Sequence, residues 1–179
     1  MKFQETELPG AYVIELDRVE DRRGFFARVW CEKEFAEHGL VPRWVQANTS
    51  LNHKAGTLRG MHYQAAPFQA TKLVRCTRGA LYDVIVDLRL DSATYKRWIG
   101  VELTAGNYRM LYVPADFAHG FITLEDHTEV TYLVSQPYKP GAERGLRWND
   151  PQFSIDWPRG VDVISEKDAA WADFAETGA

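Results

Sequence analysis

In Leu58-Arg59-Gly60-Met61-His62-Tyr63-Gln64, a cation and an imidazole stand three residues apart in a segment that otherwise has the composition of a buried β-strand. Further along the chain, Lys72, His119 and Tyr132 are each embedded in a similar run of strand-forming residues. Burying such side chains costs free energy unless something polar lies between them. The sequence therefore predicts a protein that binds an anion or moves a proton.

Short runs of β-branched and aromatic residues recur along the chain, separated by Gly, Pro, Asn or Asp. A spacing of about 8–12 residues between such runs is typical of an antiparallel β-sandwich or barrel. The sequence shows no repeat or linker, so we expect one domain over residues 1–179. The predicted strands are Ala11–Leu16, Gly24–Trp30, Trp44–Ser50, Thr57–Gln64, Lys72–Thr77, Ala80–Leu88, Trp98–Leu103, Arg109–Val113, Gly120–Leu124 and Glu129–Val134.

Turn and helix signals complete this pattern. Thr77–Ala80 and Glu125–Thr128 are predicted to form tight hairpin turns, because each carries turn-forming residues between two strand-like runs. One short helix is predicted over Cys31–Gly39, which ends in a glycine. A second helix is predicted near the C-terminus, with an N-cap at Ser165 and a run through Ala169–Ala175.

The amino-acid composition limits which classes of partner the protein is expected to bind. A net charge of −4 and a sequence pI near 5.7 provide no overall basic field for nucleic acid, so a local cluster must hold any anionic ligand. Cys31 and Cys76 are too few for a disulfide framework and lack CxxC spacing. We find neither an apolar leader nor a run of 18 apolar residues, and therefore expect a cytoplasmic protein without membrane contact.

Strand periodicity raises a question about the opening motif. In a regular strand Arg59 and His62 face opposite ways, because alternate residues point to opposite faces. A bulge at Gly60 would bring both side chains onto one wall. In a later predicted strand, Asp83 and Asp87 share a face with aliphatic side chains.

Eight segments along nearly the whole chain form an ordered set: Asp21-Arg22-Arg23-Gly24-Phe25-Phe26, Arg59–Gln64, Lys72-Leu73-Val74, Tyr82–Arg89, Ala118-His119-Gly120-Phe121, Tyr132–Ser135, Trp148-Asn149-Asp150-Pro151 and Ser165-Glu166-Lys167-Asp168. This set resembles the dTDP-4-dehydrorhamnose 3,5-epimerase family. The resemblance implies an all-β antiparallel jelly roll of the cupin type with a few short helices, a homodimer, and no cofactor. It also implies an isomerase that epimerises C3, C5 or both in a nucleotide-linked 4-keto-6-deoxyhexose, as in dTDP-rhamnose synthesis for cell-surface polysaccharide.

This chemistry needs a base on one face of the sugar, an acid on the other, and a donor at the ketone oxygen. The resemblance makes His62 the base, whose ordinary pKa of about 6.5 suits proton transfer at neutral pH. It pairs His62 with Asp168, which would fix the imidazole tautomer. Tyr132 is the matching acid, with a phenol of ordinary pKa about 10. Lys72 would lie beside the developing enolate oxygen.

Substrate binding is expected to centre on the pyrophosphate, for which guanidinium groups provide a planar fork of donors. The resemblance assigns Arg23 and Arg59 to this role. It also implies that each site takes residues from both subunits of the dimer, so Arg23 is expected to serve the neighbour's site. The other residues that it assigns to substrate binding are Gln46, Asn48, Lys72, His119, Glu143 and Lys167.

Two departures from the family pattern leave the substrate open. Arg28 stands where the family usually carries Glu, and the loop over residues 48–57 is one residue longer than usual. The nucleotide, the sugar, and whether C3, C5 or both are inverted therefore remain undetermined. The nearest alternative is a C3-only epimerase that acts on another activated deoxysugar.

Two functions from other protein classes are alternatives to an epimerase. A metal-dependent cupin enzyme would need two His and a carboxylate at close spacing, whereas Gln64 follows His62 and no acidic residue stands just beyond it; no metal is expected. A non-catalytic sugar-nucleotide binding protein is a third reading, which the intact set of His62, Lys72 and Tyr132 argues against. Structural alternatives are a core role for Tyr132, helix-dipole pairing for Asp168, and solvation for Lys72.

Overall fold

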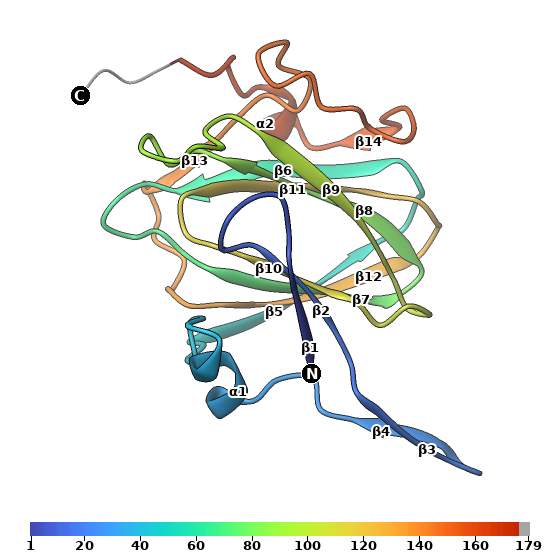
Figure 1. Cartoon of the computed structure of the whole chain (residues 1–179). Coiled ribbons are helices and arrows are strands. Elements are labelled where there is room, and N and C mark those ends of the chain that lie inside the picture. Colours follow the sequence, from blue (N-terminus) through green and yellow to red (C-terminus); the bar gives the residue numbers. More distant parts are fainter. Residues whose placement is uncertain (176–179) are drawn as a thin grey trace.

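The computed structural model describes residues 1–175 and consists of two β-sheets packed face to face (Figure 1). The first sheet contains, in spatial order, β1 (Lys2–Glu5), β2 (Tyr12–Glu15), β10 (Met110–Val113), β7 (Lys72–Arg78), β12 (Thr128–Val134) and β5 (Gln46–Asn52). The second contains β13 (Glu143–Gly145), β6 (Thr57–Gln64), β11 (Phe117–Thr123), β8 (Ala80–Asp87) and β9 (Trp98–Thr104). All these neighbours pair antiparallel, and β14 (Val163–Ile164) adds a short parallel pair to β6.

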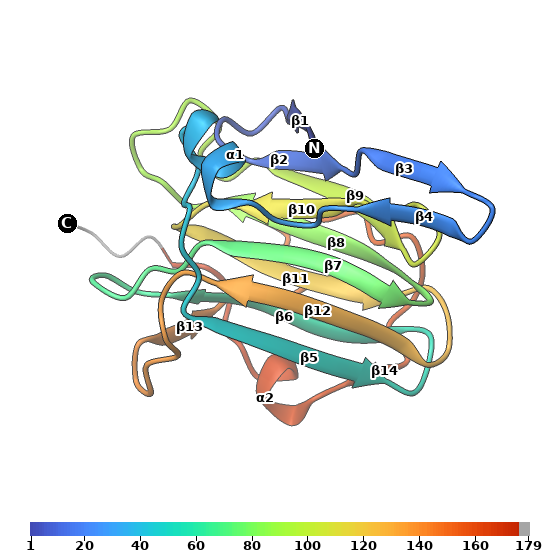
Figure 2. The same ribbon diagram turned by 90° about the horizontal axis from the view of Figure 1, so that it is seen from below.

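The predicted all-β antiparallel fold is confirmed, and each of the ten predicted strands overlaps a strand of the structure. Sequence reasoning missed the short strands β1, β3 (Arg18–Asp21), β13 and β14. The predicted strand Gly24–Trp30 ends early, because β4 covers only Gly24–Ala27. Together, β3 and β4 form a two-stranded hairpin that projects from the body of the sandwich (Figure 2).

The two predicted hairpins are wrong. Thr77–Ala80 leads from β7 in the first sheet to β8 in the second, and Glu125–Thr128 leads from β11 in the second sheet to β12 in the first. Gly79 and His127 have positive φ values of 74° and 57°, so the chain does turn sharply at both places. Local turn chemistry shows where the chain turns, but it does not determine which sheet receives the next strand.

The helices differ in how well the sequence predicts them. α1 (Glu32–Glu37) lies within the predicted range and buries Phe35. The predicted helix over Ala169–Ala175 is wrong, because α2 spans only Glu166–Ala169. Its predicted N-cap is correct, since the Ser165 side chain accepts from the Asp168 amide. Within residues 1–175 no helix is long and apolar enough to cross a membrane.

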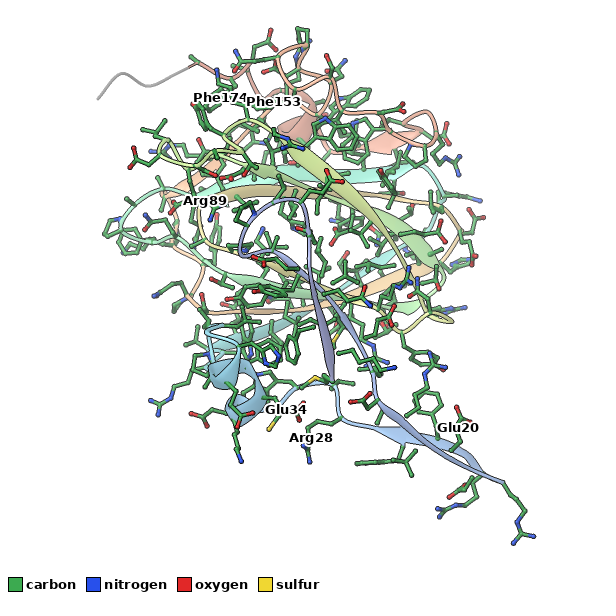
Figure 3. All side chains as sticks on the ribbon, in the orientation of Figure 1. Glu20, Arg28, Glu34, Arg89, Phe153 and Phe174 are labelled. Carbon is green, nitrogen blue, oxygen red and sulfur yellow. The ribbon has the colours of Figure 1, made fainter. Side chains whose placement is uncertain are left out.

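Tertiary contacts explain why α2 ends early. The Phe174 amide donates to the Asp150 carboxylate at 2.6 Å, and the ring of Phe174 lies 5.5 Å from that of Phe153 (Figure 3). Trp171 packs so closely on Gly145 that a Cβ at Gly145 would overlap its ring. These contacts draw residues 170–175 into an extended path over the second sheet.

Three apolar clusters hold the layers together. The cluster between the sheets includes Leu81, Ile85, Leu111, Phe121 and Val130, all at most 5% exposed. A second cluster lies where α1 packs against the first sheet, and a third lies where the C-terminal segment covers the second sheet (Figure 1). Full burial of each large aliphatic side chain contributes about 1.5–3 kcal/mol.

A bulge in β6 decides which of its side chains face the interior. His62 pairs with His119 and Arg59 pairs with Phe121, so two residues of β6 oppose one residue of β11. Cross-strand partners share a face, and Phe121 belongs to the cluster between the sheets. Arg59 and His62 therefore both point to the face of the second sheet that is turned toward the first, as a bulge at Gly60 predicts; His62 is partly buried there, whereas Arg59 is exposed.

We predict that Gly60→Ala destabilises the protein by about 2–4 kcal/mol. Gly60 has a φ of 132°, and a Cβ there would lie 2.5 Å from the Cα of Gly120. Urea denaturation measures the change in the free energy of unfolding. Gly160→Ala is the matched control, because a Cβ at that glycine meets nothing within 4 Å. Equal stability of the two variants would contradict this account of the bulge.

Candidate active site

A cavity of about 250 Å³ opens at one end of the sandwich. At this end β7 and β11 begin and β6 and β12 finish, so side chains from both sheets line it. Its polar lining includes His62 from the second sheet, and Lys72 and Tyr132 from the first. The remaining lining residues are Gln46, Asn48, Tyr63, Gln64, Ala70, Asp116, Phe117, Val134, Gln136, Tyr138 and Glu143.

One wall of the cavity carries a histidine–carboxylate pair. Nε2 of His62 lies 2.6 Å from Oδ1 of Asp168, which α2 brings to β6 from the C-terminal part of the chain. The other carboxylate oxygen of Asp168 accepts from the Gly60 amide at 3.2 Å, and its backbone amide donates to the Ser165 hydroxyl at 3.0 Å. The bulge and the helix cap thus hold the carboxylate in place. Because Asp168 binds Nε2 of His62, Nδ1 is the ring nitrogen that Asp168 does not bind.

The electrostatics of Asp168 suit this pairing. Burial by itself raises the pKa of the Asp168 carboxyl group, since only 6% of the side chain is exposed. The hydrogen bond with His62, its charge, and the bonds from Gly60 and Ser165 outweigh burial and keep the pKa below its usual value. Asp168 is therefore ionised at neutral pH and can stabilise a protonated His62.

A second polar chain lies beside this pair. Nζ of Lys72 donates to the His62 carbonyl oxygen at 3.4 Å and lies 3.3 Å from Nδ1 of His119. Nε2 of His119 in turn lies 2.7 Å from Oδ1 of Asp83, which is fully buried. The structure therefore connects Lys72, His119 and Asp83 across the two sheets.

Burial lowers the pKa of the Lys72 amine to about 8, while the charges of Asp83 and Glu143 partly oppose the shift. Burial also lowers the pKa of His119, and the Lys72 charge acts in the same direction. At neutral pH the pair therefore consists of a charged lysine and a neutral histidine. A charged donor in a dry cavity can stabilise a developing oxyanion.

Tyr132 faces His62 from the opposite sheet. Its ring packs against the central cluster, and on β5 its cross-strand partner is Asn48. Burial raises the pKa of the Tyr132 phenol, and the Arg59 charge opposes that rise. The phenol is protonated at neutral pH, so it can donate a proton into the cavity.

Polar residues at the rim form three further hydrogen bonds. Nε2 of Gln46 donates to Oδ1 of Asn48 at 2.8 Å. Oε2 of Glu143 accepts from Lys167 at 2.5 Å and from the Tyr138 hydroxyl at 3.1 Å. Burial raises the pKa of Glu143, but these two donors outweigh burial and lower it overall. The structure thus brings three of the predicted binding residues, Gln46, Asn48 and Glu143, to this rim, with Lys167 bonded to Glu143 outside the lining.

Both arginines predicted to bind phosphate lie outside the lining of the cavity. Arg59 faces the interior, but its Nε donates to Oδ1 of Asn52 at 2.7 Å. Arg23 lies in the turn of the β3–β4 hairpin with 90% of its side chain exposed, and pairs with Asp21. Near the base of that hairpin, Arg28 donates to Glu34 at 2.9 Å (Figure 3). In this one chain, the structure does not bring Arg23 to the cavity.

Sequence reasoning missed Asp83 and Tyr138 as site residues. Asp83 carried a signal, because it shares a strand face with Leu81 and Ile85, and a carboxylate on an aliphatic face needs a partner. Tyr138 lies in a segment without strand or helix periodicity, so no pattern pointed to it. Among residues 1–175, no three His, Cys, Asp or Glu side chains are arranged to hold a metal ion.

The fold and the cavity define the class of protein: a cupin-like jelly roll with an acid–base set inside the sandwich. The chain belongs to the dTDP-4-dehydrorhamnose 3,5-epimerase family, whose model matches residues 5–176. A relative named dTDP-4-dehydrorhamnose 3,5-epimerase, from Sinorhizobium fredii, is 44% identical over 98% of this chain and 91% of its own length.

Solved structures agree with this assignment. An epimerase of the same name from Bacillus anthracis, with TDP and PPi bound, is 42% identical with a TM-score of 0.93, over 97% of this chain and 99% of that one. The dTDP-6-deoxy-D-glucose-3,5-epimerase of Legionella pneumophila, in complex with dTDP-4-keto-L-rhamnose, is 38% identical with a TM-score of 0.89. That match covers 95% of this chain and 90% of the other.

We predict that the Lys72 amine titrates near pH 8, well below an exposed lysine, which NMR titration of the lysine Cε resonances can measure. Its folded-state pKa lies below the unfolded value of 10.5, so the folded protein binds fewer protons between these limits. The contribution of Lys72 to the free energy of unfolding therefore rises with pH across that window. Lys167 is the internal control, because Glu143 raises its pKa. A Lys72 that stays protonated at pH 10 would contradict the prediction.

Proposed function

We propose that this protein epimerises a dTDP-linked 4-keto-6-deoxyhexose at C3 and C5, converting dTDP-4-dehydro-6-deoxyglucose to dTDP-4-dehydrorhamnose. The observation that carries the proposal is the arrangement of the cavity. A histidine–carboxylate pair lies on one sheet, a protonated phenol lies on the other, and an ammonium lies at the same end of the sandwich. The names of the relatives support the same substrate class.

The first step removes a proton from the carbon next to the C4 ketone. Nδ1 of His62 takes this proton, and Asp168, bonded to Nε2, stabilises the imidazolium that results. The electron pair of the broken C–H bond moves onto the ketone oxygen and forms an enolate. The Lys72 ammonium donates to that oxygen, an interaction of a kind whose removal costs about 3 kcal/mol in other enzymes.

The second step returns a proton to the opposite face of the same carbon. Tyr132 donates its phenolic proton, the enolate collapses to the ketone, and the configuration of the carbon is inverted. The phenolate then recovers a proton from water, and the His62 imidazolium releases one. Proton number and charge are thus restored without a redox partner, and the cycle repeats at the second carbon.

Substrate binding is proposed to use the polar residues around this set. His119 and Lys72 would contact the sugar, whereas Gln46 and Asn48 would contact the nucleotide or its ribose. Glu143 and Lys167 form the far rim, and Arg59 adds positive charge on the interior face. Guanidinium and ammonium groups match the two negative phosphates of such a substrate.

We further propose that residues 1–179 act as one domain in a homodimer with shared sites. The β3–β4 hairpin supports this: Val19 and Phe26 pair across its strands and are 69% and 74% exposed. Exposed apolar pairs of this kind favour a protein contact. Arg23, in the turn of the same hairpin, would then enter the partner's cavity. A cytoplasmic location is proposed because a charged nucleotide sugar does not cross a bilayer unaided, with cell-surface polysaccharide as the destination of the product.

We predict that His62→Asn abolishes deuterium exchange from D₂O at both C3 and C5, because no base remains. Binding of the nucleotide sugar should change by no more than about tenfold, or 1.4 kcal/mol. Tyr132→Phe should still permit exchange but slow inversion, because the base is intact and the opposing acid is lost. NMR of the product follows both processes.

Identical behaviour of the two variants would contradict the division between base and acid. Exchange at C3 alone in the unmodified protein would instead indicate the C3-only epimerase. Binding without exchange at either carbon would indicate a sugar-nucleotide binding protein. The same NMR spectra distinguish all these outcomes. The His62→Asn variant serves as the control for spontaneous deuterium exchange, which proceeds without catalysis.

The shared site can be tested by mixing two defective variants. Arg23→Ala and His62→Asn should each be impaired, yet mixed dimers would contain one site with both residues intact. Reassociation of equal amounts should restore about a quarter of wild-type activity, because half the dimers are mixed and each has one working site. Arg22→Ala, also in the hairpin turn, is the matched control and should stay active. If the mixture is no more active than the mean activity of the two unmixed variants, the shared site is contradicted.

A further inference from the structure

Asp83 is a buried carboxylate whose two oxygens are used unequally. Its side chain is fully buried on β8, facing the interior of the sandwich. Oδ1 lies 2.7 Å from Nε2 of His119, whereas Oδ2 has no hydrogen-bond partner among residues 1–175. A buried carboxylate with a free oxygen is costly, so this arrangement calls for a functional explanation.

The hydrogen bonds around His119 determine its tautomer. A Lys72 ammonium has only donors, and an Asp83 carboxylate has only acceptors. His119 lies between them, with Nδ1 3.3 Å from Nζ of Lys72 and Nε2 bonded to Asp83. Only the neutral Nε2–H tautomer satisfies both neighbours, because it accepts at Nδ1 and donates at Nε2.

We propose that Asp83 is a positioning residue: by bonding Nε2–H, it fixes the tautomer in which Nδ1 of His119 accepts from Lys72 and holds the ammonium in the cavity. The effect on catalysis rests on the proposed function, in which Lys72 donates to the enolate oxygen. Asp83 itself does not line the cavity. It acts through His119, and its charge favours the protonated lysine.

The other groups around Lys72 do not replace this role. From β6, the His62 carbonyl oxygen accepts from Nζ at 3.4 Å, and from β13 the charge of Glu143 favours the ammonium. From β12, Tyr132 contributes a neutral phenol to the same cavity. Burial lowers the pKa of Lys72 to about 8, and Asp83 is the largest influence that opposes it.

A second buried aspartate on the same strand provides the comparison. Asp87 is also fully buried on the interior face of β8, but it accepts from Arg89, Ser92 and Thr94 (Figure 3). These donors lower its pKa to about 2 despite burial. Asp87 thus has its carboxylate oxygens bonded to several donors, as in a structural role, whereas the one hydrogen bond of Asp83 goes to His119, which contacts the cavity residue Lys72.

The test compares Asp83→Asn with Asp87→Asn. An amide at position 83 no longer specifies the tautomer of His119, because it can accept from Nε2–H through its oxygen or donate to Nε2 through its nitrogen. Two-bond ¹H–¹⁵N spectra of His119 should show Nε2–H alone in the wild type and a lower fraction of Nε2–H in Asp83→Asn. The apparent pKa of the alkaline limb in the pH profile of kcat should fall by about one to two units, the range by which a nearby charge moves a pKa. KM should change less than twofold.

Asp87→Asn should lower stability but leave both the His119 spectrum and the alkaline limb in place. An Nδ1–H tautomer in the wild type would overturn the proposal, and this measurement needs no variant to fold. An unmoved alkaline limb in Asp83→Asn would also overturn it, because the charge of Asp83 is lost whichever way the amide is oriented. Because the tautomer is read without substrate, failure of the proposed epimerase activity would be seen separately.

Discussion

The hydrogen bond between His62 and Asp168 is the interaction on which the site depends. It joins residues 106 positions apart at 2.6 Å. The bulge at Gly60 turns His62 toward the interior and presents a backbone amide to the same carboxylate. The Ser165 cap holds the short helix that brings Asp168 into place. A strand irregularity and a helix of four residues thus hold one oriented imidazole.

The sandwich architecture supplies the second requirement, which is two separate walls. Inversion at carbon needs proton donors and acceptors on opposite faces of the substrate. His62 belongs to one sheet and Tyr132 to the other, so the space between the sheets separates them. The same separation allows a cavity to open where the apolar cluster between the sheets ends. The packing that stabilises the fold and the geometry that serves the proposed chemistry therefore have one origin.

Electrostatics in this cavity follow from burial. Burial alone disfavours both a charged Lys72 and an ionised Asp168. Each is kept charged by specific partners: Asp83 and Glu143 for the lysine, and His62, the Gly60 amide and the Ser165 side chain for the aspartate. The charge pattern is therefore a property of the assembled network and not of any residue alone. Removing one partner is expected to change the protonation state of another.

The sequence alone located ten of the strands, because periodicity of two and β-branched composition are local properties of the chain, but it missed the short strands β1, β3, β13 and β14. It also placed Asp83 on one strand face with aliphatic side chains. Motif resemblance pointed to some of the residues that line the cavity, including His62, Lys72 and Tyr132, but also to Arg23 and Arg59, which do not line it. Only the tertiary structure decided that the turns before β8 and β12 change sheets, and that the chain after α2 is extended. It also paired Asp83 with His119. Those outcomes depend on contacts between residues far apart in sequence, which local patterns do not encode.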